Sequence, residues 1–217
     1  MERAGGYVAR KDFDPAQMSA RDFYQLLTSV VVPRPIAWVS TTSAEGVDNL
    51  APHSFYTVAS VDPPVIQFTS VGEKDSLRNI QALGEFVVNL TPAFLFEEVS
   101  ATGTDFPAAT SEFDAVGLPR ELSTMVRPPR VKDSPVALEC QLHSTLELGN
   151  CTLVFGRVVY AVVSTSVLDG DHPQIDLLEP LSRLGGNEWG TLGPIQELRR
   201  IRAKDWPGHF GAPGQGE

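Results

Sequence analysis

A lysine flanked by hydroxyl residues is the part of the sequence best suited to binding a charged group. Ser70, Lys74 and Ser76 lie where an apolar run ends and a helical pattern begins. A helix start exposes unpaired N–H groups and the positive end of the helix dipole, so Lys74 and the Ser76 hydroxyl could hold a phosphate there. Asn79, one turn further along, could reach the same place. Taken alone, the segment is better interpreted as an ordinary capped helix with a solvated lysine.

A second segment, which begins at Asn49 and ends at Tyr56, carries residue types suited to a planar ligand. Asn49 and Ser54 offer polar contacts, Ala51 permits close approach, and Phe55 and Tyr56 offer flat apolar surface. A planar polar heterocycle is held by this mixture, because a few fixed hydrogen bonds orient it on otherwise apolar walls. The other interpretation is a hairpin connection followed by an ordinary buried strand.

A third segment runs from Arg183 to Trp189 and contains two adjacent glycines, Gly185 and Gly186. The glycines allow close backbone approach, Arg183 could meet an anion, and Trp189 could stack on a ring. A turn with a surface arginine is an equally good interpretation of these residues.

Hydrolytic and metal chemistry find little support in the sequence. None of the four histidines lies at metal-ligand spacing from another histidine or a cysteine. Ser54 follows His53 directly, but neighbouring side chains of a strand point to opposite faces, so the two do not form a catalytic pair. No Gly-x-Ser-x-Gly nucleophile turn occurs. We therefore interpret His53 as a capping or hydrogen-bonding strand residue.

The composition excludes several classes of partner. The 217 residues carry a formal net charge of −10 without a run of Lys or Arg, which argues against binding nucleic acid. No apolar run approaches the roughly 20 residues of a membrane-spanning helix, and the N-terminus lacks the apolar core of a signal peptide. We therefore expect a cytoplasmic protein with no membrane partner. In that compartment Cys140 and Cys151 are expected to be small buried hydrophobic residues rather than a disulfide.

The apolar periodicity predicts short helices placed among strands. Asp75 or Ser76 is expected to cap a helix that Gly84 closes. Strict alternation from Val136 to Leu148 is the clearest strand signal, and a turn then returns the chain in a partner strand. Further helices are expected at residues 20–29, 92–100 and 112–115, and further strands at residues 36–41, 58–61, 65–70, 86–90 and 153–164.

These elements suggest one domain over residues 19–205, after an N-terminal arm at residues 1–18. Residues 101–130 form either a lid or a packed surface excursion, and the Pro- and Gly-rich residues 206–217 are expected to be a disordered tail. Regular strand–helix alternation is missing, as are the glycine-rich turns of dinucleotide and P-loop domains. The fold class is therefore mainly β, a closed or nearly closed antiparallel barrel with added helices.

Several motifs, taken in chain order, resemble the flavin reductase-like family, whose members bind FMN on a split β-barrel. The resemblance extends from about Leu26 to Leu198; each motif alone is weak, but the ordered set is strong. The motifs are residues 33–41 (PRPIAWVST), 49–56 (NLAPHSFY), 62–64 (DPP), 74–80 (KDSLRNI), 84–89 (GEFVVN), 128–131 (PPRV), 137–140 (ALEC) and 184–186 (LGG), followed by Trp189.

The resemblance implies an FMN-binding split β-barrel, Greek-key-like and antiparallel, that forms a homodimer with FMN near the subunit interface. Trp189 stands where the family often has tyrosine and Tyr56 where it often has phenylalanine, which leaves the substrate's shape open. Three groups of contacts are implied: Ser40, Thr41, Asn49, Ala51, Ser54 and Phe55 along the flavin ring and ribityl chain; Ser70, Lys74, Ser76 and Asn79 at the phosphate; and Arg183 and Trp189 closing the site, from either subunit.

The implied activity is an oxidoreductase reaction in which FMN takes a hydride from NAD(P)H and passes electrons onward. The acceptor could be free flavin, a partner oxygenase, a metal chelate or a small organic molecule such as an activated alkene. No side-chain nucleophile or base is needed, because the reactive chemistry belongs to the cofactor. Two alternatives stay open: a flavin-binding electron carrier or sensor without steady NAD(P)H turnover, and a barrel that has lost its flavin.

Overall fold

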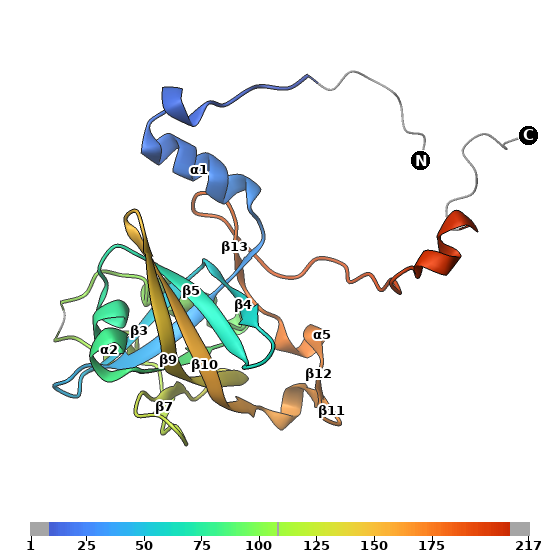
Figure 1. Ribbon diagram of the computed structural model, residues 1–217. Helices are drawn as coiled ribbons and strands as arrows, with labels where there is room; N and C mark the ends of the chain where they lie inside the picture. Colours follow the sequence, from blue (N-terminus) through green and yellow to red (C-terminus); the bar gives the residue numbers. More distant parts are fainter. Residues whose placement is uncertain (1–8, 108, 209–217) are drawn as a thin grey trace, which may run out of the picture.

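The computed structural model describes residues 9–107 and 109–208, and its centre is one seven-stranded antiparallel sheet (Figure 1). The strand order is β3-β2-β6-β9-β10-β5-β4. The two edge strands, β3 and β4, are consecutive in the chain and joined only by Ser54 and Phe55, so the sheet must curl until its edges meet. The strands are β2 (Ala37–Thr42), β3 (Asp48–His53), β4 (Tyr56–Ser60), β5 (Val65–Val71), β6 (Glu85–Asn89), β9 (Val136–Leu148) and β10 (Cys151–Val163).

The predicted fold class, a mainly β split barrel, is confirmed by this sheet. Strand β9 has the bounds that its alternation predicts, and its partner β10 pairs with it along its length, with register shifts after Phe155 and Val158. The side chains of β2 alternate between two faces, because Ala37 and Val39 face one apolar cluster while Trp38 faces another.

The barrel interior is filled by a tightly packed apolar cluster. Phe68 and Phe86 meet edge to face, with ring centroids 5.6 Å apart, and both are fully buried. The absence of a side chain at Gly156 leaves room for the Phe86 ring, because a Cβ at this position would lie 2.1 Å from Phe86 Cζ. Cys140 belongs to this cluster, and burial raises the pKa of its thiol. Cys140 and Cys151 are free thiols; Cys140 is buried as predicted, whereas Cys151 is only half-buried.

Helix α2 (Asp75–Leu83) packs on the same cluster through Leu77 and Ile80. Gly84 ends the helix with a φ of 72°, as predicted. The predicted cap is wrong: the N-cap is Lys74, not Asp75 or Ser76, and no side chain in the described part of the chain caps the helix. Because a lysine side chain has no acceptor atom, the N–H groups of the first turn are left without a side-chain acceptor.

Helix α1 (Ala20–Val30) covers the predicted residues 20–29, and its N-cap is Ser19, whose hydroxyl accepts a hydrogen bond from the Asp22 N–H at 3.1 Å. The helix lies beside the barrel rather than on it, so the side chains of Leu27 and Val30 stay exposed (Figure 1). Its end is fastened by Arg34, whose guanidinium donates to the carbonyls of Thr28, Val31 and Leu184.

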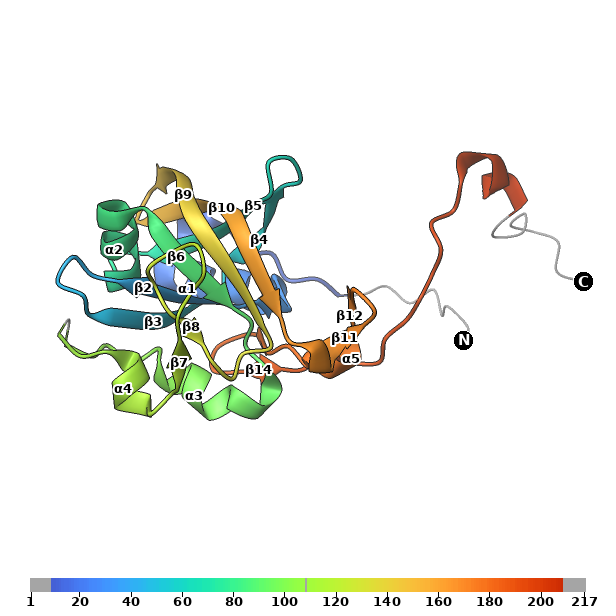
Figure 2. The same cartoon turned by 90° about the horizontal axis from the view of Figure 1, so that it is seen from below.

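Residues 101–107 and 109–130 pack along one side of the barrel, together with the preceding helices (Figure 2). Phe113 and Leu118 are buried against Trp38 and Leu50 on the outer face of the sheet. The elements here are η2 (Ala93–Leu95), α3 (Phe96–Ala101), α4 (Glu112–Val116), and the pair β7 (Arg120–Glu121) and β8 (Arg130–Val131).

The C-terminal part adds small elements to the other end of the molecule. Residues 191–202 leave the barrel without regular structure and end in η4 (Ala203–Gly208), which includes the first three residues of the expected tail (Figure 1). The rest of that tail, residues 209–217, lies outside the described residues, as do residues 1–8 of the expected arm. The remaining elements are η1 (Pro15–Gln17), β1 (Arg34–Pro35), η3 (Thr165–Val167), β11 (Leu168–Asp169), β12 (His172–Pro173), α5 (Ile175–Leu178), β13 (Ser182–Arg183) and β14 (Trp189–Gly190).

Membrane-spanning helices were not expected from the sequence. Among residues 9–107 and 109–208, every helix is too short or too polar to cross a membrane.

Candidate functional site

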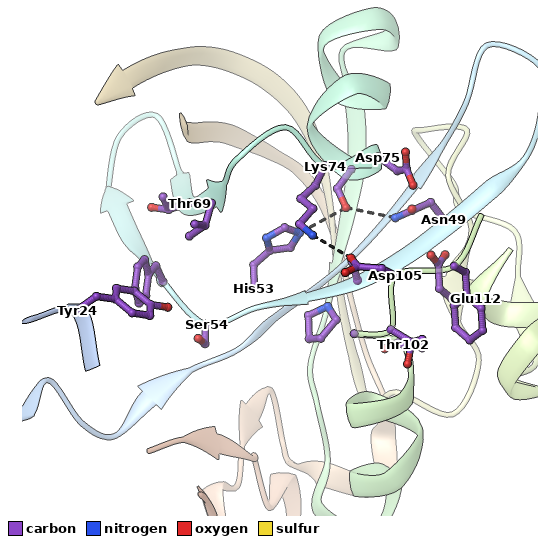
Figure 3. A pocket seen from close by; sticks show the side chains of 18 residues that line it. Tyr24, Asn49, His53, Ser54, Thr69, Lys74, Asp75, Thr102, Asp105 and Glu112 are labelled. Carbon is purple, nitrogen blue, oxygen red and sulfur yellow. Dashed lines mark hydrogen bonds and ion pairs between the residues drawn. The ribbon is translucent and has the colours of Figure 1, made fainter. Parts of the chain in front are cut away.

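A cavity of about 250 Å³ opens where the two edges of the curled sheet meet (Figure 3). One wall is β3 with the link that follows it, from Asn49 to Phe55, and the facing wall is Thr69 and Val71 of β5. The start of α2 and residues 102–106 close the sides, and Tyr24 of α1 and Glu112 of α4 complete the lining. The cavity therefore collects residues from six separate stretches of the chain.

The start of α2 gives the cavity its one lysine. The Lys74 ammonium group lies 2.9 Å from the Asp105 carboxylate, and both side chains are largely exposed, at 52% and 89%. The first-turn N–H groups of α2 point out of the helix beside this lysine and have no intrahelical partner. These groups are the cationic and N–H donors of the cavity, whose lining also holds the carboxyl groups of Asp75, Asp105 and Glu112.

A buried hydrogen-bonded cluster lies under the start of α2. The Asn49 Nδ2 group donates to Ser76 Oγ at 3.2 Å, and His53 Nε2 lies 3.4 Å from the same oxygen. His53 packs on the Phe68 ring with a centroid distance of 4.7 Å. Burial lowers the pKa of His53 to about 4; a hydrogen bond to the Thr69 backbone opposes this shift, and the nearby charge of Lys74 adds to it. The imidazole is therefore neutral near pH 7.

Glu112 lies on the opposite side of the cavity, buried at the edge of β3. Its Oε2 accepts a hydrogen bond from the Leu50 N–H at 2.8 Å, which satisfies an unpaired donor of the edge strand. Burial raises the pKa of this carboxyl group, against the effect of its backbone hydrogen bonds. Thr102, in the adjoining loop, is held by the Trp38 indole, which donates to its hydroxyl at 2.9 Å.

A sequence model of the family described as "Flavin reductase like domain" matches residues 29–178. The chain belongs to the flavin reductase-like family. The predicted family is thereby confirmed, and the match takes in the whole barrel and the lining of the cavity except Tyr24.

Relatives of this flavin reductase-like chain share most of its length. An uncharacterised protein of Bacillus subtilis (strain 168) is 37% identical over 202 residues, covering 88% of this chain and 98% of the relative. Among solved structures, component B of nitrilotriacetate monooxygenase from Bacillus cereus has a TM-score of 0.85 at 31% identity, covering 88% of this chain and 100% of that one. The 2-nitrobenzoate 2-nitroreductase of Pseudomonas fluorescens has a TM-score of 0.83 at 31% identity, covering 88% and 96%.

The structure brings together half of the residues that the sequence singled out for the cofactor. Those that line the cavity are Asn49, Ala51, Ser54, Phe55, Lys74 and Ser76. They come from two segments, the β3 wall and the start of α2, whose side chains meet through the hydrogen bond between Asn49 and Ser76. Their contact with a flavin stays a prediction.

Four of the other predicted residues are placed around the cavity rather than in its lining. Ser40 is buried on the outer face of β2 and donates to the Pro129 carbonyl at 2.5 Å, because strand alternation turns it away from Thr41. Thr41 is also buried, and its hydroxyl accepts from Asn79 Nδ2 at 3.0 Å. Ser70 donates to the Gly72 carbonyl at 2.9 Å.

Asn79 lines a second cavity of about 360 Å³, which lies on the other side of the start of α2 and shares Asn49 and Asp75 with the first. Arg183 and Trp189 lie together on β13 and β14, outside the lining of both cavities. The Arg183 guanidinium stacks over the Trp189 ring at 4.4 Å and donates to the Gly186 carbonyl at 2.9 Å.

Sequence reasoning missed several residues of the lining, chiefly Tyr24, Asp105 and Glu112. Asp105 and Glu112 belong to residues 101–130, where periodicity is weak, and their contacts reach across 31 and 62 residues of chain. A pattern of neighbouring residues in the sequence does not predict contacts over such distances along the chain. Tyr24 lies on a predicted helix, but the position of that helix beside the barrel decides where its ring points. The ring centroids of Tyr24 and Phe55 lie 6.4 Å apart.

Proposed function

We propose that this chain is an FMN-dependent oxidoreductase that takes a hydride from NAD(P)H onto bound flavin and passes electrons to a second acceptor. The observation that carries the proposal is the cavity at the open edge of the barrel, where the uncapped start of α2 and Lys74 face an amide- and aromatic-lined wall. Membership of the flavin reductase-like family supports a flavin as the ligand.

The residues present fit the two chemically different ends of FMN. A phosphate needs cationic and N–H donors, which Lys74 and the first turn of α2 provide. A flat ring needs apolar surface with a few polar contacts, which Phe55, Ala51 and Ser54 provide on the wall formed by β3 and the link after it. The phosphate end therefore belongs beside α2, with Asn79 in reach from the second cavity.

Bound FMN would supply two-electron chemistry, accepting a hydride from the nicotinamide and releasing electrons to the acceptor. The residues of this chain bind and orient the cofactor. Backbone N–H groups and hydroxyls beside the ring position would stabilise the negative charge that develops on reduction, because they are already held in place. Lys74 would contribute to binding through the phosphate alone, since its charge lies at the start of α2.

We further propose that the working unit is a homodimer with FMN near the interface. The cavity of one chain, about 250 Å³, is smaller than the roughly 300–1,000 Å³ of most ligand pockets. A partner subunit would enlarge and close it. Arg183 and Trp189, which are paired but lie outside the cavity of their own chain, are the residues we propose to close the site of the partner.

The acceptor is proposed to be a partner oxygenase or a small organic molecule. The two solved structures at 31% identity are component B of a monooxygenase and a 2-nitrobenzoate nitroreductase, whose names point to an oxygenase and to a small nitro compound as the respective acceptors. Free flavin and a metal chelate are the further acceptors to include in an assay.

The test is the absorbance spectrum of the purified protein, followed by anaerobic addition of NADH or NADPH. We expect protein-bound FMN, released by acid, and rapid bleaching of its visible band by one of the two nicotinamides. Bleaching by dithionite alone would replace the reductase with an electron carrier or sensor. A colourless protein that takes up no added FMN would overturn flavin binding altogether.

A further inference from the structure

Three polar side chains form a closed network under the start of α2. Asn49, His53 and Ser76 are exposed by only 7%, 9% and 1%, and two of them converge on the Ser76 hydroxyl at 3.2 and 3.4 Å. Figure 3 draws the contacts from Asn49 and His53 as dashed lines and places them directly beside Lys74. The mechanism proposed above gives His53 no task, although it lines the cavity.

The directions of these hydrogen bonds follow from the donors and acceptors present. The Asn49 amide can only donate through Nδ2, so Ser76 Oγ accepts from it. The Thr69 N–H donates to the Phe55 carbonyl at 2.9 Å, and the Thr69 carbonyl lies on the same edge of the extended strand. A hydrogen bond from the His53 ring to the Thr69 backbone raises the pKa of His53, and the Thr69 carbonyl is the acceptor that this edge offers to the ring.

A neutral His53 with its proton on Nδ1 can donate to that carbonyl. In this tautomer Nε2 is an acceptor, and the Ser76 proton is directed to it rather than into the cavity. In this state Ser76 presents no donor to an anion. A proton on Nε2 reverses the direction: His53 and Asn49 then both donate to Ser76 Oγ, and the Ser76 proton is free to point into the cavity.

We propose that His53 is a positioning residue for an anionic ligand group at the start of α2, acting through the direction of the Ser76 hydroxyl. The inference rests on the proposed function, which supplies the phosphate of FMN as the anion. Binding of the phosphate and binding of a proton to His53 favour each other, because the phosphate needs the donor that only the protonated ring releases.

The charged groups around His53 act in both directions. Lys74 lowers the pKa of His53, while Asp75 beside it, Asp105 in the facing loop and Glu112 on α4 line the same cavity and carry or can carry negative charge. A bound phosphate would displace Asp105 from Lys74 and add its own charge, so the pKa of His53 rises from about 4 on binding. A group whose pKa rises on binding takes up a proton, so affinity increases as pH falls toward the lower value.

The test is a fluorescence titration of the full chain with FMN and with riboflavin between about pH 8 and pH 5.5, a range that contains the phosphate's own pKa of about 6. His53→Gln is the matched variant, because its amide can donate to Ser76 at every pH and does not titrate. Dividing the FMN-to-riboflavin affinity ratio of the wild type by that of the variant removes the phosphate's own titration.

We expect this quotient to rise roughly threefold to tenfold over the range, below the limit of about tenfold per pH unit for one coupled proton. Superimposable profiles would overturn the inference while leaving flavin binding intact. Ser76→Ala, read in the same way, is expected to lose most of the rise, and a full rise in that variant would show that His53 does not act through Ser76. Failure of the wild type to bind either flavin would overturn both proposals.

Discussion

The interior of the barrel and its open edge are built on opposite principles. The interior is apolar and filled, with Phe68, Phe86 and Gly156 packed so closely that one added carbon has no room. The open edge instead buries Asn49 and His53 and satisfies them through hydrogen bonds. Apolar packing stabilises the fold in proportion to buried area, whereas hydrogen-bonded polar groups add little net stability but fix geometry.

That difference predicts that the two regions can be damaged separately. The largest effect is expected for Phe86→Ala, which empties the centre of the barrel and should lower the free energy of unfolding by about 3–5 kcal/mol. Urea unfolding measures the loss. Ser76→Ala, at the open edge and equally buried, should change it by about 1 kcal/mol.

A second pair of variants examines the packing itself. Gly156→Ala should destabilise the protein in the presence of Phe86 and much less in the Phe86→Ala background, because the clash partner is then gone. Gly193→Ala is the control, since its Cβ would meet nothing within 4 Å. Equal costs for Gly156→Ala in both backgrounds would contradict the close packing at this site.

The pH dependence of stability should reveal the open edge, because its histidine is buried without a charge partner. The pKa of His53 is about 4 in the folded chain, against 6.5 for an unperturbed, solvent-exposed histidine, so the unfolded chain binds the proton more strongly. Stability contributed by neutral His53 is therefore present above pH 6.5 and is lost as pH falls toward 4. The free energy of unfolding should fall by roughly 3 kcal/mol over this range. Urea unfolding at about pH 6.5 and pH 4 measures this fall, and His53→Gln should remove this part of it.

The same contrast explains which features could be read from the sequence. Alternation from Val136 to Leu148 predicted β9 with its bounds, and Gly84 predicted the end of α2, because both signals are local. The N-cap of α2 was misplaced by one or two residues, because Asp75 and Ser76 were good local candidates and the tertiary structure selected Lys74.

The site was only half predictable for the same reason. Residue types marked the wall at Ala51 and Phe55, but the facing loop with Asp105 and the carboxyl group of Glu112 reach the cavity only through the packing of residues 101–130. Strand alternation alone would have turned Ser40 to the outer face, although its partner, the Pro129 carbonyl, could not have been foreseen.

Lys74 is the residue whose loss should affect binding without affecting the barrel. Lys74→Ala removes one charge-assisted contact, worth about 1.5–3 kcal/mol, so FMN affinity should fall roughly tenfold to hundredfold. Riboflavin, which has no phosphate, should bind as before. Lys132→Ala is the control, since Lys132 is exposed and lies outside the lining of both cavities. Equal losses for FMN and riboflavin would place the phosphate elsewhere.

The smallest effect is expected at Asp105, and its direction is the informative part. Asp105 holds Lys74 at 2.9 Å in an exposed ion pair, and such pairs contribute at most about 1 kcal/mol. A phosphate at the start of α2 must compete with this carboxylate for the same ammonium group. Asp105→Asn should therefore raise FMN affinity by up to about fivefold, with stability unchanged, while Asp133→Asn, an exposed control, should leave affinity as it is. A weaker affinity in Asp105→Asn would mean that Asp105 helps to hold the ligand, and the open edge would then be a pocket completed by its loop rather than one that the loop partly obstructs.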